Sequence, residues 1–208
     1  MSTELEMPAE LAAVAAGEAE AVARLRASLV DAAGADGLID VAYRLVDSPV
    51  GPLLLAGTAV GLVRVAFARE GHDAVLQSLA VTVSPRILRA PARLDDAARE
   101  LEEYFAGRRR LFDLPLDLRL ATGFRREVLA HLPEIGYGHT ASYATVAALT
   151  SSPHAVRAVG TACARNPLPL VVPCHRVVRS DGSRGSYLGG TEAKALLLDL
   201  EAGAATCP

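Results

Sequence analysis

The sequence is poor in cysteine and has no long apolar run, and each shortage excludes a class of protein. Of its 208 residues, 51% are hydrophobic, yet no uninterrupted apolar stretch reaches the roughly 20 residues that a membrane-spanning helix needs. The three cysteines (Cys163, Cys174 and Cys207) are an odd number without a CxxC pair, which argues against a disulfide scaffold and against a cysteine-rich zinc site. Residues 1–120 hold no cysteine and one histidine, so no metal site is expected there.

Basic residues are missing from the N-terminus. The first arginine is Arg24, and Glu4, Glu6 and Glu10 stand where a secretory signal would carry basic residues. We therefore expect a cytoplasmic protein whose thiols stay reduced.

Acidic residues are missing from positions 135–180. The chain as a whole has a net charge of −3, but residues 1–120 hold 13 basic and 18 acidic residues, whereas residues 121–208 hold 8 basic and 6 acidic ones. The stretch without acids carries Arg157, Arg165, Arg176 and Arg179. A surface without carboxylates and with scattered arginines is typical of proteins that bind a phosphate backbone. Chance in an alanine-rich sequence is the alternative explanation.

The first half of the chain predicts an extension followed by a small α/β domain. Residues 1–37 are rich in alanine and glutamate and predict one or two helices, or a partly disordered segment. Residues 39–46, 53–56 and 62–67 predict an antiparallel meander, because turn residues separate these apolar runs. A helix is expected from Asp95 to Phe105, and the shift in charge balance places a domain boundary within residues 108–122.

The second half predicts mostly helices. One helix is expected over residues 124–133, and two short helices over 143–149 and about 154–165 match a helix-turn-helix. Residues 167–173 contain three prolines, so we expect an extended, buried approach to Cys174. A last helix should run from Thr191 to Glu201, with three leucines inward. These are Leu196, Leu197 and Leu200.

Cys174 and His175 are the residues most suited to chemistry. A thiol with a pKa of about 8.5 is mostly inactive at neutral pH, so a nucleophilic cysteine needs a base beside it, and His175 could take its proton directly or through a water. A carboxylate would orient the imidazole, and Glu201 is a candidate. A Cys-His pair alone is weak support, because most buried cysteines are simply small apolar residues. The nearby helix pair and the glycine-rich segment after residue 181 strengthen the hypothesis.

Several short motifs surround this pair at fixed places in the chain. They are P-C-H-R-V-V at 173–178, T-x-S-Y at 140–143, R-A-V-G at 157–160, N-P-x-P at 166–169 and G-S-Y-L-G-G at 185–190. Together they resemble the O6-alkylguanine-DNA alkyltransferases, also called methylated-DNA–protein-cysteine methyltransferases. The resemblance runs from about residue 41 to residue 203 and is strongest after residue 122. It implies an RNase H-like α/β domain over residues 38–118. A mostly α C-terminal domain with a winged-helix-like helix-turn-helix would follow over residues 119–208.

The resemblance also implies an activity and catalytic roles. Cys174 would take the alkyl group from O6 of guanine, or from O4 of thymine, in double-stranded DNA. The thioether formed is stable, so each molecule would act once, as a monomer and without a cofactor. Tyr143 would crowd the 3′ phosphate and protonate the leaving guanine, and Asn166 would brace the Cys-His turn and contact His175.

Further residues are implied at the DNA and around the flipped base, which must leave the stack to be reached. Small residues on the second helix would allow close approach to the minor groove, Arg157 would fill the hole left by the base, and Arg176 would form a structural salt bridge. The residues implied to contact DNA are Tyr143, Ala155, Arg157, Ala158, Gly160 and Thr161. Those implied to form the base pocket are Pro169, Val172, Ser180, Tyr187 and Leu188.

Leu188 departs from the family pattern, because many members have serine or another small residue there. Three other interpretations remain open. An alkyltransferase-like protein would bind the lesion without repairing it, which the presence of Cys174 disfavours. A helix-turn-helix regulator could use Cys174 as a sensor, although no dimerisation heptads are present. A cysteine hydrolase would turn over a small substrate and need no DNA.

Overall fold

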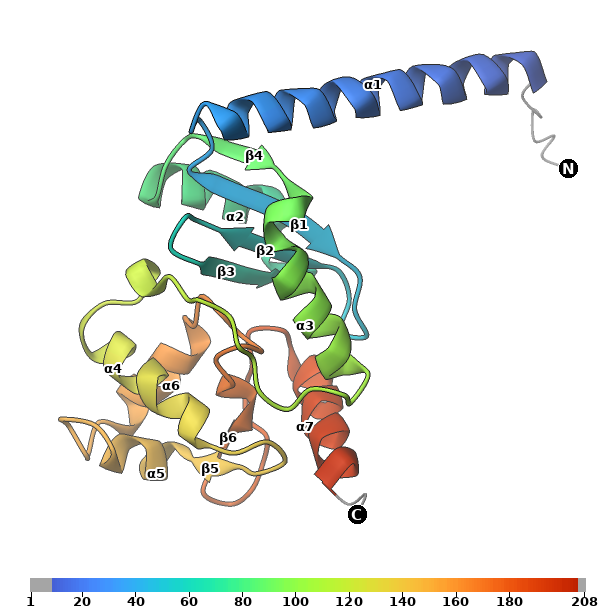
Figure 1. Ribbon diagram of the computed structural model, residues 1–208. Coiled ribbons are helices and arrows are strands. Elements are labelled where there is room, and N and C mark those ends of the chain that lie inside the picture. The colour runs from blue at the N-terminus through green and yellow to red at the C-terminus, as the bar shows by residue number, and fades with distance from the viewer. Residues whose placement is uncertain (1–8, 206–208) are drawn as a thin grey trace, which may run out of the picture. The chain divides into compact units, whose positions relative to one another are not determined.

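The computed structural model describes residues 9–205, and the chain divides into two compact units, residues 1–39 and 40–208. From residue 9 onward the first unit contains one helix, α1 (Ala9–Ala35), where the sequence predicted one or two (Figure 1). No helix within residues 9–205 combines the length and the apolar character needed to cross a membrane.

The second unit begins with a four-stranded sheet in the order β3-β2-β1-β4. β1 (Val41–Val46), β2 (Leu53–Gly57) and β3 (Leu62–Phe67) form the predicted antiparallel meander. β4 (Ile87–Arg89) pairs in parallel with β1 and was not predicted, because three residues are too few to show a period. All five residues of β2 are buried, as expected of a strand that is covered on both faces.

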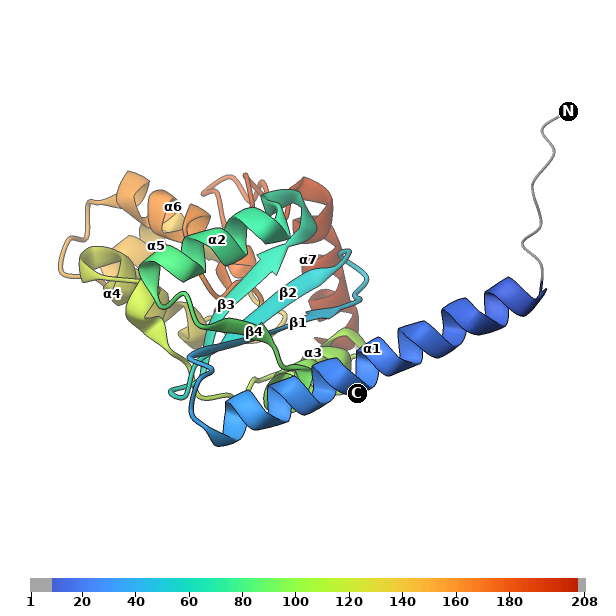
Figure 2. The same ribbon diagram turned by 90° about the horizontal axis from the view of Figure 1, so that it is seen from above.

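Two helices cover the two faces of this sheet (Figures 1 and 2). α2 (His72–Thr82) packs Val75 and Leu79 against strand residues that include Leu54 and Val63. The sequence analysis missed α2. The opposite face receives α3 (Asp95–Phe105), whose bounds match the prediction. Alternate strand residues therefore point to different helices, and the sheet is the centre of the N-terminal half.

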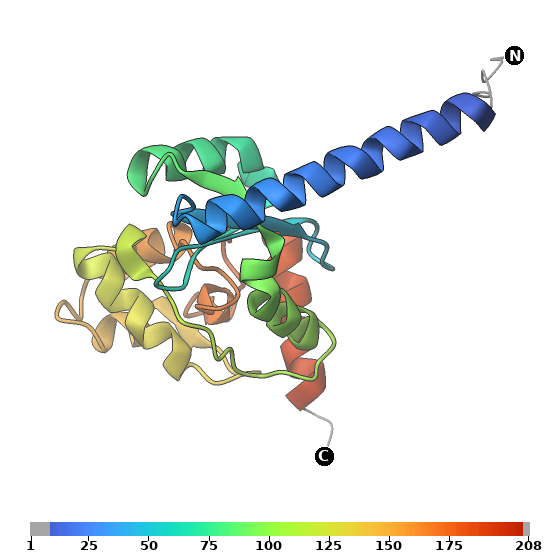
Figure 3. The ribbon, with the colours of Figure 1, turned by 45° about the horizontal axis from the view of Figure 1, so that its top comes forward.

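The C-terminal half is mostly helical, as predicted (Figure 3). Its helices are α4 (Gly123–His131), α5 (Tyr143–Ala148), α6 (Val156–Ala164) and α7 (Thr191–Ala205). α5 and α6 pack together as the predicted helix-turn-helix, and the Ser142 hydroxyl caps α5 by accepting a hydrogen bond from the Thr145 N–H. A short parallel pair, β5 (Ala141–Ser142) and β6 (Val177–Val178), connects the start of α5 to the segment after Cys174.

Two local predictions are wrong. The proline-containing run before Cys174 is buried but turned rather than extended: the Val172 N–H donates to the Leu168 carbonyl, and Leu170 adopts a positive φ of 75°. On α7, Leu196 is 36% exposed, and Lys194 takes an inward position beside Leu197. Prolines restrict their own φ but do not forbid turns between them, and apolar spacing did not distinguish Leu196 from Lys194.

β3 is an edge strand, and the C-terminal half covers its edge. The Val65 N–H donates to the Pro167 carbonyl over 2.9 Å. The segment that follows α6 therefore continues the hydrogen bonding of the sheet and removes an exposed edge. This contact joins the sheet to the segment that leads to Cys174.

Candidate functional site

Cys174 begins a 3₁₀ turn (Cys174–Arg176) at the side of a cleft of about 900 Å³. The cysteine is 2% exposed. The walls of the cleft come from α6, from Tyr143, from residues 185–188 and from the turn after β3. Segments from both halves of the sequence therefore line the cleft beside one thiol.

Asn166 holds the thiol directly. Its side-chain N–H groups donate to the Cys174 Sγ over 3.1 Å and to the Val172 carbonyl over 2.8 Å, and its Oδ1 accepts from the Leu168 N–H. Asn166 is 1% exposed, so these bonds are shielded from water. The hydrogen bonds of the Asn166 amide therefore run to the turn before His175 and to the sulfur, and none of them runs to His175.

The environment of Cys174 favours the thiol over the thiolate. Burial raises the pKa of Cys174 to about 11, although the hydrogen bond from Asn166 and the nearby Lys194 act in the opposite direction. The sequence led us to expect an environment that maintains a thiolate. The thiol is therefore protonated at neutral pH, so any reaction of the Cys174 sulfur as a nucleophile must include removal of this proton.

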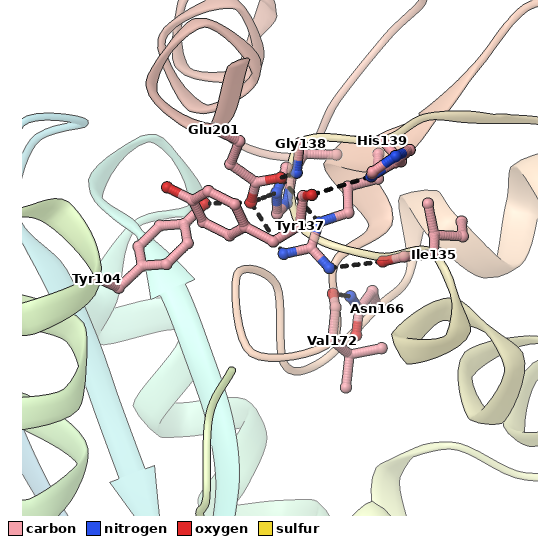
Figure 4. A network of polar contacts seen from close by, with 10 residues as sticks. Tyr104, Ile135, Tyr137, Gly138, His139, Asn166, Val172 and Glu201 are labelled. Atoms are coloured by element: carbon pink, nitrogen blue, oxygen red, sulfur yellow. Dashed lines mark hydrogen bonds and ion pairs between the residues drawn. The ribbon is translucent and has the colours of Figure 1, made fainter. Parts of the chain in front are cut away.

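Glu201 on α7 is the centre of a buried polar network (Figure 4). Its carboxylate, 1% exposed, accepts hydrogen bonds from the Tyr104 hydroxyl over 2.7 Å and from the Gly138 N–H over 3.2 Å. Arg176 donates to it through Nε over 2.9 Å and Nη2 over 3.0 Å, which is the salt bridge expected of this arginine. Burial alone would raise the pKa of Glu201, but hydrogen bonds from His175 and Arg176 lower it to about 2. Glu201 is therefore ionised at neutral pH.

His175 follows Cys174 directly in the sequence and forms a hydrogen bond with the Glu201 carboxylate. Its Nε2 is 2.9 Å from Glu201 Oε1, and its Nδ1 is buried without a hydrogen-bond partner among the described residues. Burial lowers the pKa of His175, which makes it a neutral imidazole. Since a carboxylate only accepts, Nε2 carries the proton and Nδ1 is the basic nitrogen.

Most of the residues predicted to contact DNA lie along the cleft. Tyr143 and, on α6, Arg157, Gly160 and Thr161 line it. Burial raises the pKa of Tyr143, which keeps its hydroxyl protonated. Ala155 is the N-cap of α6 and does not line the cleft.

Ala158 lies on the exposed surface of α6, also outside the cleft. Arg179 and Val156, which the sequence analysis did not select, line the cleft instead. The stretch without acidic residues thus supplies part of the cleft lining, which includes Arg69, Arg157 and Arg179, with Glu70 as its one carboxylate.

The pocket residues predicted from the sequence divide into two groups. Tyr187 and Leu188 line the cleft, together with Gly185 and Ser186. The Tyr187 hydroxyl is buried without a partner among the described residues, and burial keeps it protonated by raising its pKa. Three predicted residues are not part of the cleft lining. Pro169 and Val172 are buried, and Ser180 is exposed in the turn after β6.

The loop that carries Tyr187 packs against the N-terminal half. Phe67 contacts the Tyr187 ring edge-on with a centroid separation of 5.6 Å. A Cβ on Gly189 would lie 2.7 Å from Phe67, and one on Gly190, at φ +94°, would lie 2.5 Å from Arg69 Nη1. Gly189 therefore allows a close approach of the loop to the Phe67 ring that a side chain would prevent, and Gly190 adopts a positive φ that favours glycine.

The sequence analysis missed several residues around the thiol. Lys194 is fully buried, and its Nζ donates to the Val177 carbonyl over 2.6 Å. A lysine three residues before Leu197 and seven before Glu201 shares their helical face, and this spacing could have identified it. Cys163 and the pair Arg69 and Glu70 also line the cleft, but no local pattern marks them. Within residues 9–205, no three His, Cys, Asp or Glu side chains gather in a way that could hold a metal ion.

Two family models match adjacent parts of the chain. Residues 41–118 match the model described as 6-O-methylguanine DNA methyltransferase, ribonuclease-like domain. Residues 123–203 match the model described as 6-O-methylguanine DNA methyltransferase, DNA binding domain. The two matches together cover most of the second compact unit.

Individual relatives agree with these matches. The methylated-DNA–protein-cysteine methyltransferase of Methanosarcina barkeri is 39% identical over 159 residues, which are 76% of this chain and 96% of the relative. The constitutive one of Bacillus subtilis is 40% identical over 160 residues, which are 76% of this chain and 94% of the relative.

Solved structures agree as well. The O6-methylguanine methyltransferase of Mycobacterium tuberculosis superposes with a TM-score of 0.71 at 37% identity, covering 81% of this chain and 96% of that one. A structure of the same organism's protein in complex with DNA gives a TM-score of 0.68 at 36% identity and covers 78% of this chain and 94% of that one.

Proposed function

The chain belongs to the 6-O-methylguanine DNA methyltransferase family, and from this we propose that Cys174 is the residue that accepts the alkyl group. The protein is a methylated-DNA–protein-cysteine methyltransferase and repairs DNA by transferring an alkyl group from the DNA to one of its own cysteines. The observation that supports Cys174 as the acceptor is its position: the sulfur is held by Asn166 at one side of the 900 Å³ cleft.

The transfer is a single displacement. The sulfur of Cys174 attacks the alkyl carbon on O6 of guanine, the S–C bond forms as the C–O6 bond breaks, and the electron pair leaves with the base. The thiol proton passes through a water to Nδ1 of His175, while Glu201 holds Nε2 and stabilises the imidazolium that forms. The Tyr143 hydroxyl, which stays protonated, supplies a proton to the departing base.

The raised pKa of the free thiol fits this sequence of events. A protonated cysteine is a weak nucleophile, so the protein without DNA is protected from adventitious alkylation and oxidation. A damaged base in the cleft would bring the electrophile and the proton acceptor together. The thioether product has no leaving group that water could displace within this site, so each molecule acts once.

DNA binding rests on α5 and α6. Gly160 and the small residues of α6 allow the backbone of double-stranded DNA to approach, and Arg157, exposed at the cleft, fills the stack after the base has left it. The flipped base enters between Tyr143 and Tyr187. O6-alkylguanine is the proposed substrate, with O4-alkylthymine as a second one. We further propose that the protein acts as a monomer, with functional domains at residues 38–118 and 119–208.

The experiment that tests the acceptor uses a duplex with one O6-methylguanine whose methyl group carries tritium. The wild-type protein should take up one label per molecule, and Cys174→Ser should take up none. Cys163→Ser is the matched control, because Cys163 is the second thiol of the cleft and should leave uptake unchanged. Full labelling of Cys174→Ser would contradict the assignment.

A further inference from the structure

A partly buried ion pair of the N-terminal half reaches the residue that holds the thiol. Arg64 lies on β3 and pairs with Glu70, and both side chains are 14% exposed. The Arg64 guanidinium also donates through Nη1 to the Pro167 carbonyl over 3.1 Å and to the Asn166 carbonyl over 3.5 Å. It therefore contacts the backbone of Asn166 and Pro167, and the side-chain amide of Asn166 contacts the Cys174 Sγ.

Glu70 is itself held by the backbone. It ends the 3₁₀ turn that follows β3 (Ala68–Glu70), and its Oε1 accepts from the Phe67 N–H over 2.8 Å. Its other oxygen receives the Arg64 guanidinium. A planar guanidinium clamped by a carboxylate at one end cannot rotate freely, so the direction of its remaining N–H groups is fixed.

The corner formed by Asn166 and Pro167 is hydrogen-bonded to β3 through its two carbonyl groups. Pro167 has no N–H, so its carbonyl is its only backbone hydrogen-bonding group, and it accepts from both Arg64 and the Val65 N–H. A tilt of this corner would move the Asn166 amide away from the sulfur.

We propose that the Arg64–Glu70 pair is a positioning device for the transfer reaction, in which β3 sets the Asn166–Pro167 corner and thereby the position of the Cys174 sulfur. This inference rests on the proposed function only in taking Cys174 as the acceptor. Arg64 touches neither the thiol nor the cleft around it, whereas Glu70 contributes to the cleft wall. The N-terminal half would then take part in catalysis through a defined route and not only as a support.

The test compares three variants with a matched control. Arg64→Met removes the charge and the hydrogen bonds, Glu70→Gln removes the clamp, and Arg64→Lys keeps the charge but not the planar fork. Arg44→Met is the control, because Arg44 also lies on a strand of the sheet and pairs with a helix carboxylate, Asp95, outside the cleft. Each protein is measured for thermal unfolding, for the affinity for an undamaged duplex, for the single-turnover rate of methyl transfer, and for the rate at which iodoacetamide modifies the Cys174 peptide.

We expect Arg64→Met and Glu70→Gln to slow methyl transfer about ten- to a hundred-fold, as small misplacements of a reacting atom do. Duplex affinity should be unchanged in Arg64→Met, because Arg64 does not line the cleft. Arg64→Lys should fall between these variants and the wild type, and Arg44→Met should transfer at the wild-type rate. In an Asn166→Ala background, Arg64→Met should slow methyl transfer little further, because Arg64 acts on the sulfur through the Asn166 amide, which is already missing.

Two results would overturn the proposal. The first is a normal transfer rate in Arg64→Met together with a lowered melting temperature, which would mean that the pair only stabilises the fold. The second is additive loss of rate in the double variant with Asn166→Ala. If the wild-type protein transferred no methyl group, the proposed function would fail by itself. The change in iodoacetamide reactivity between wild type and Arg64→Met would then still decide whether the pair positions the sulfur.

Discussion

Replacing Glu201 by glutamine should be among the most costly single-atom changes in this protein. The carboxylate accepts hydrogen bonds from His175, Arg176, Tyr104 and the Gly138 N–H, and each of these groups is a donor. Glutamine has one acceptor oxygen, and its amide nitrogen would have to face a donor. At least one buried donor would be left without a partner, and the Arg176 guanidinium, 4% exposed, would lose its counter-charge.

Two lines of reasoning give the same loss of unfolding free energy for Glu201→Gln. Removing one partner of a buried ion pair costs about 3–5 kcal/mol of unfolding free energy. The pKa of Glu201 falls from 4.5 to about 2, and because one pKa unit corresponds to about 1.4 kcal/mol, ionised Glu201 contributes roughly 3 kcal/mol. We therefore expect Glu201→Gln to lose about 3 kcal/mol at pH 7.

The dependence on pH has a definite sign. A carboxyl group whose pKa is lowered in the folded state stabilises the protein above its unfolded pKa and loses that effect as the pH falls through the folded pKa. The difference between the wild type and Glu201→Gln should therefore be constant above about pH 5 and shrink towards pH 2.

The assay is urea unfolding followed by circular dichroism, with Asp199→Asn as the control. Asp199 lies on the same helix and pairs with Arg184, but its side chain is 66% exposed, so its loss should cost less than about 1 kcal/mol. An equal loss of unfolding free energy in both variants, below about 1 kcal/mol, would refute the reasoning about the Glu201 network.

Four further predictions follow from the cleft. Iodoacetamide should modify the Cys174 peptide of the free protein with a rate that keeps rising up to pH 10, because only the thiolate reacts and the pKa lies near 11; a plateau below pH 8 would contradict this. Lys194→Met should raise the thiol pKa further and slow modification at every pH, since the ammonium favours the thiolate. Gly189→Ala should slow methyl transfer because its Cβ would lie 2.7 Å from the Phe67 ring, whereas Gly182→Ala, at positive φ but with open space around it, should cost only its backbone strain in thermal unfolding. Arg157→Ala should weaken duplex binding and reduce the slope of log affinity against log salt by about one, measured by fluorescence anisotropy.

Local patterns were sufficient to predict much of the fold. The β1–β3 meander, α3 and the α5–α6 pair each have a clear apolar period and turn or cap residues at their ends, and all were found within a few residues of their predicted bounds. α2 was missed, although Val75 and Leu79 are spaced for one helical face, because the other side of that helix is not distinctly polar. The turns of residues 167–173, before Cys174, depend on tertiary contacts that cannot be predicted from the residues of this segment.

The candidate site was predictable where the motif is contiguous. Cys174 and His175 are adjacent in the sequence, and Glu201 was selected as a carboxylate on the last helix. Tyr104, which binds Glu201 as His175 does, lies 97 residues before Glu201 in the sequence, and only the fold brings the two together. Pro169 and Ser180 were placed in the pocket by resemblance, but the turns around them bury the first and expose the second. The N-terminal contribution from Arg64, Phe67 and Arg69 arises from packing between two halves, which no spacing in the sequence reveals.

The most direct test of the account is a mass spectrum of tryptic peptides after incubation with a duplex that contains one O6-methylguanine. Trypsin cleaves after Arg165 and Arg176, so Cys174 lies in the peptide of residues 166–176 and Cys163 lies in a different one. The account predicts a single added methyl group on the 166–176 peptide, in an amount that never exceeds one per protein molecule. An unmodified 166–176 peptide in a protein that has bound the duplex and removed the methyl group from the guanine would contradict it.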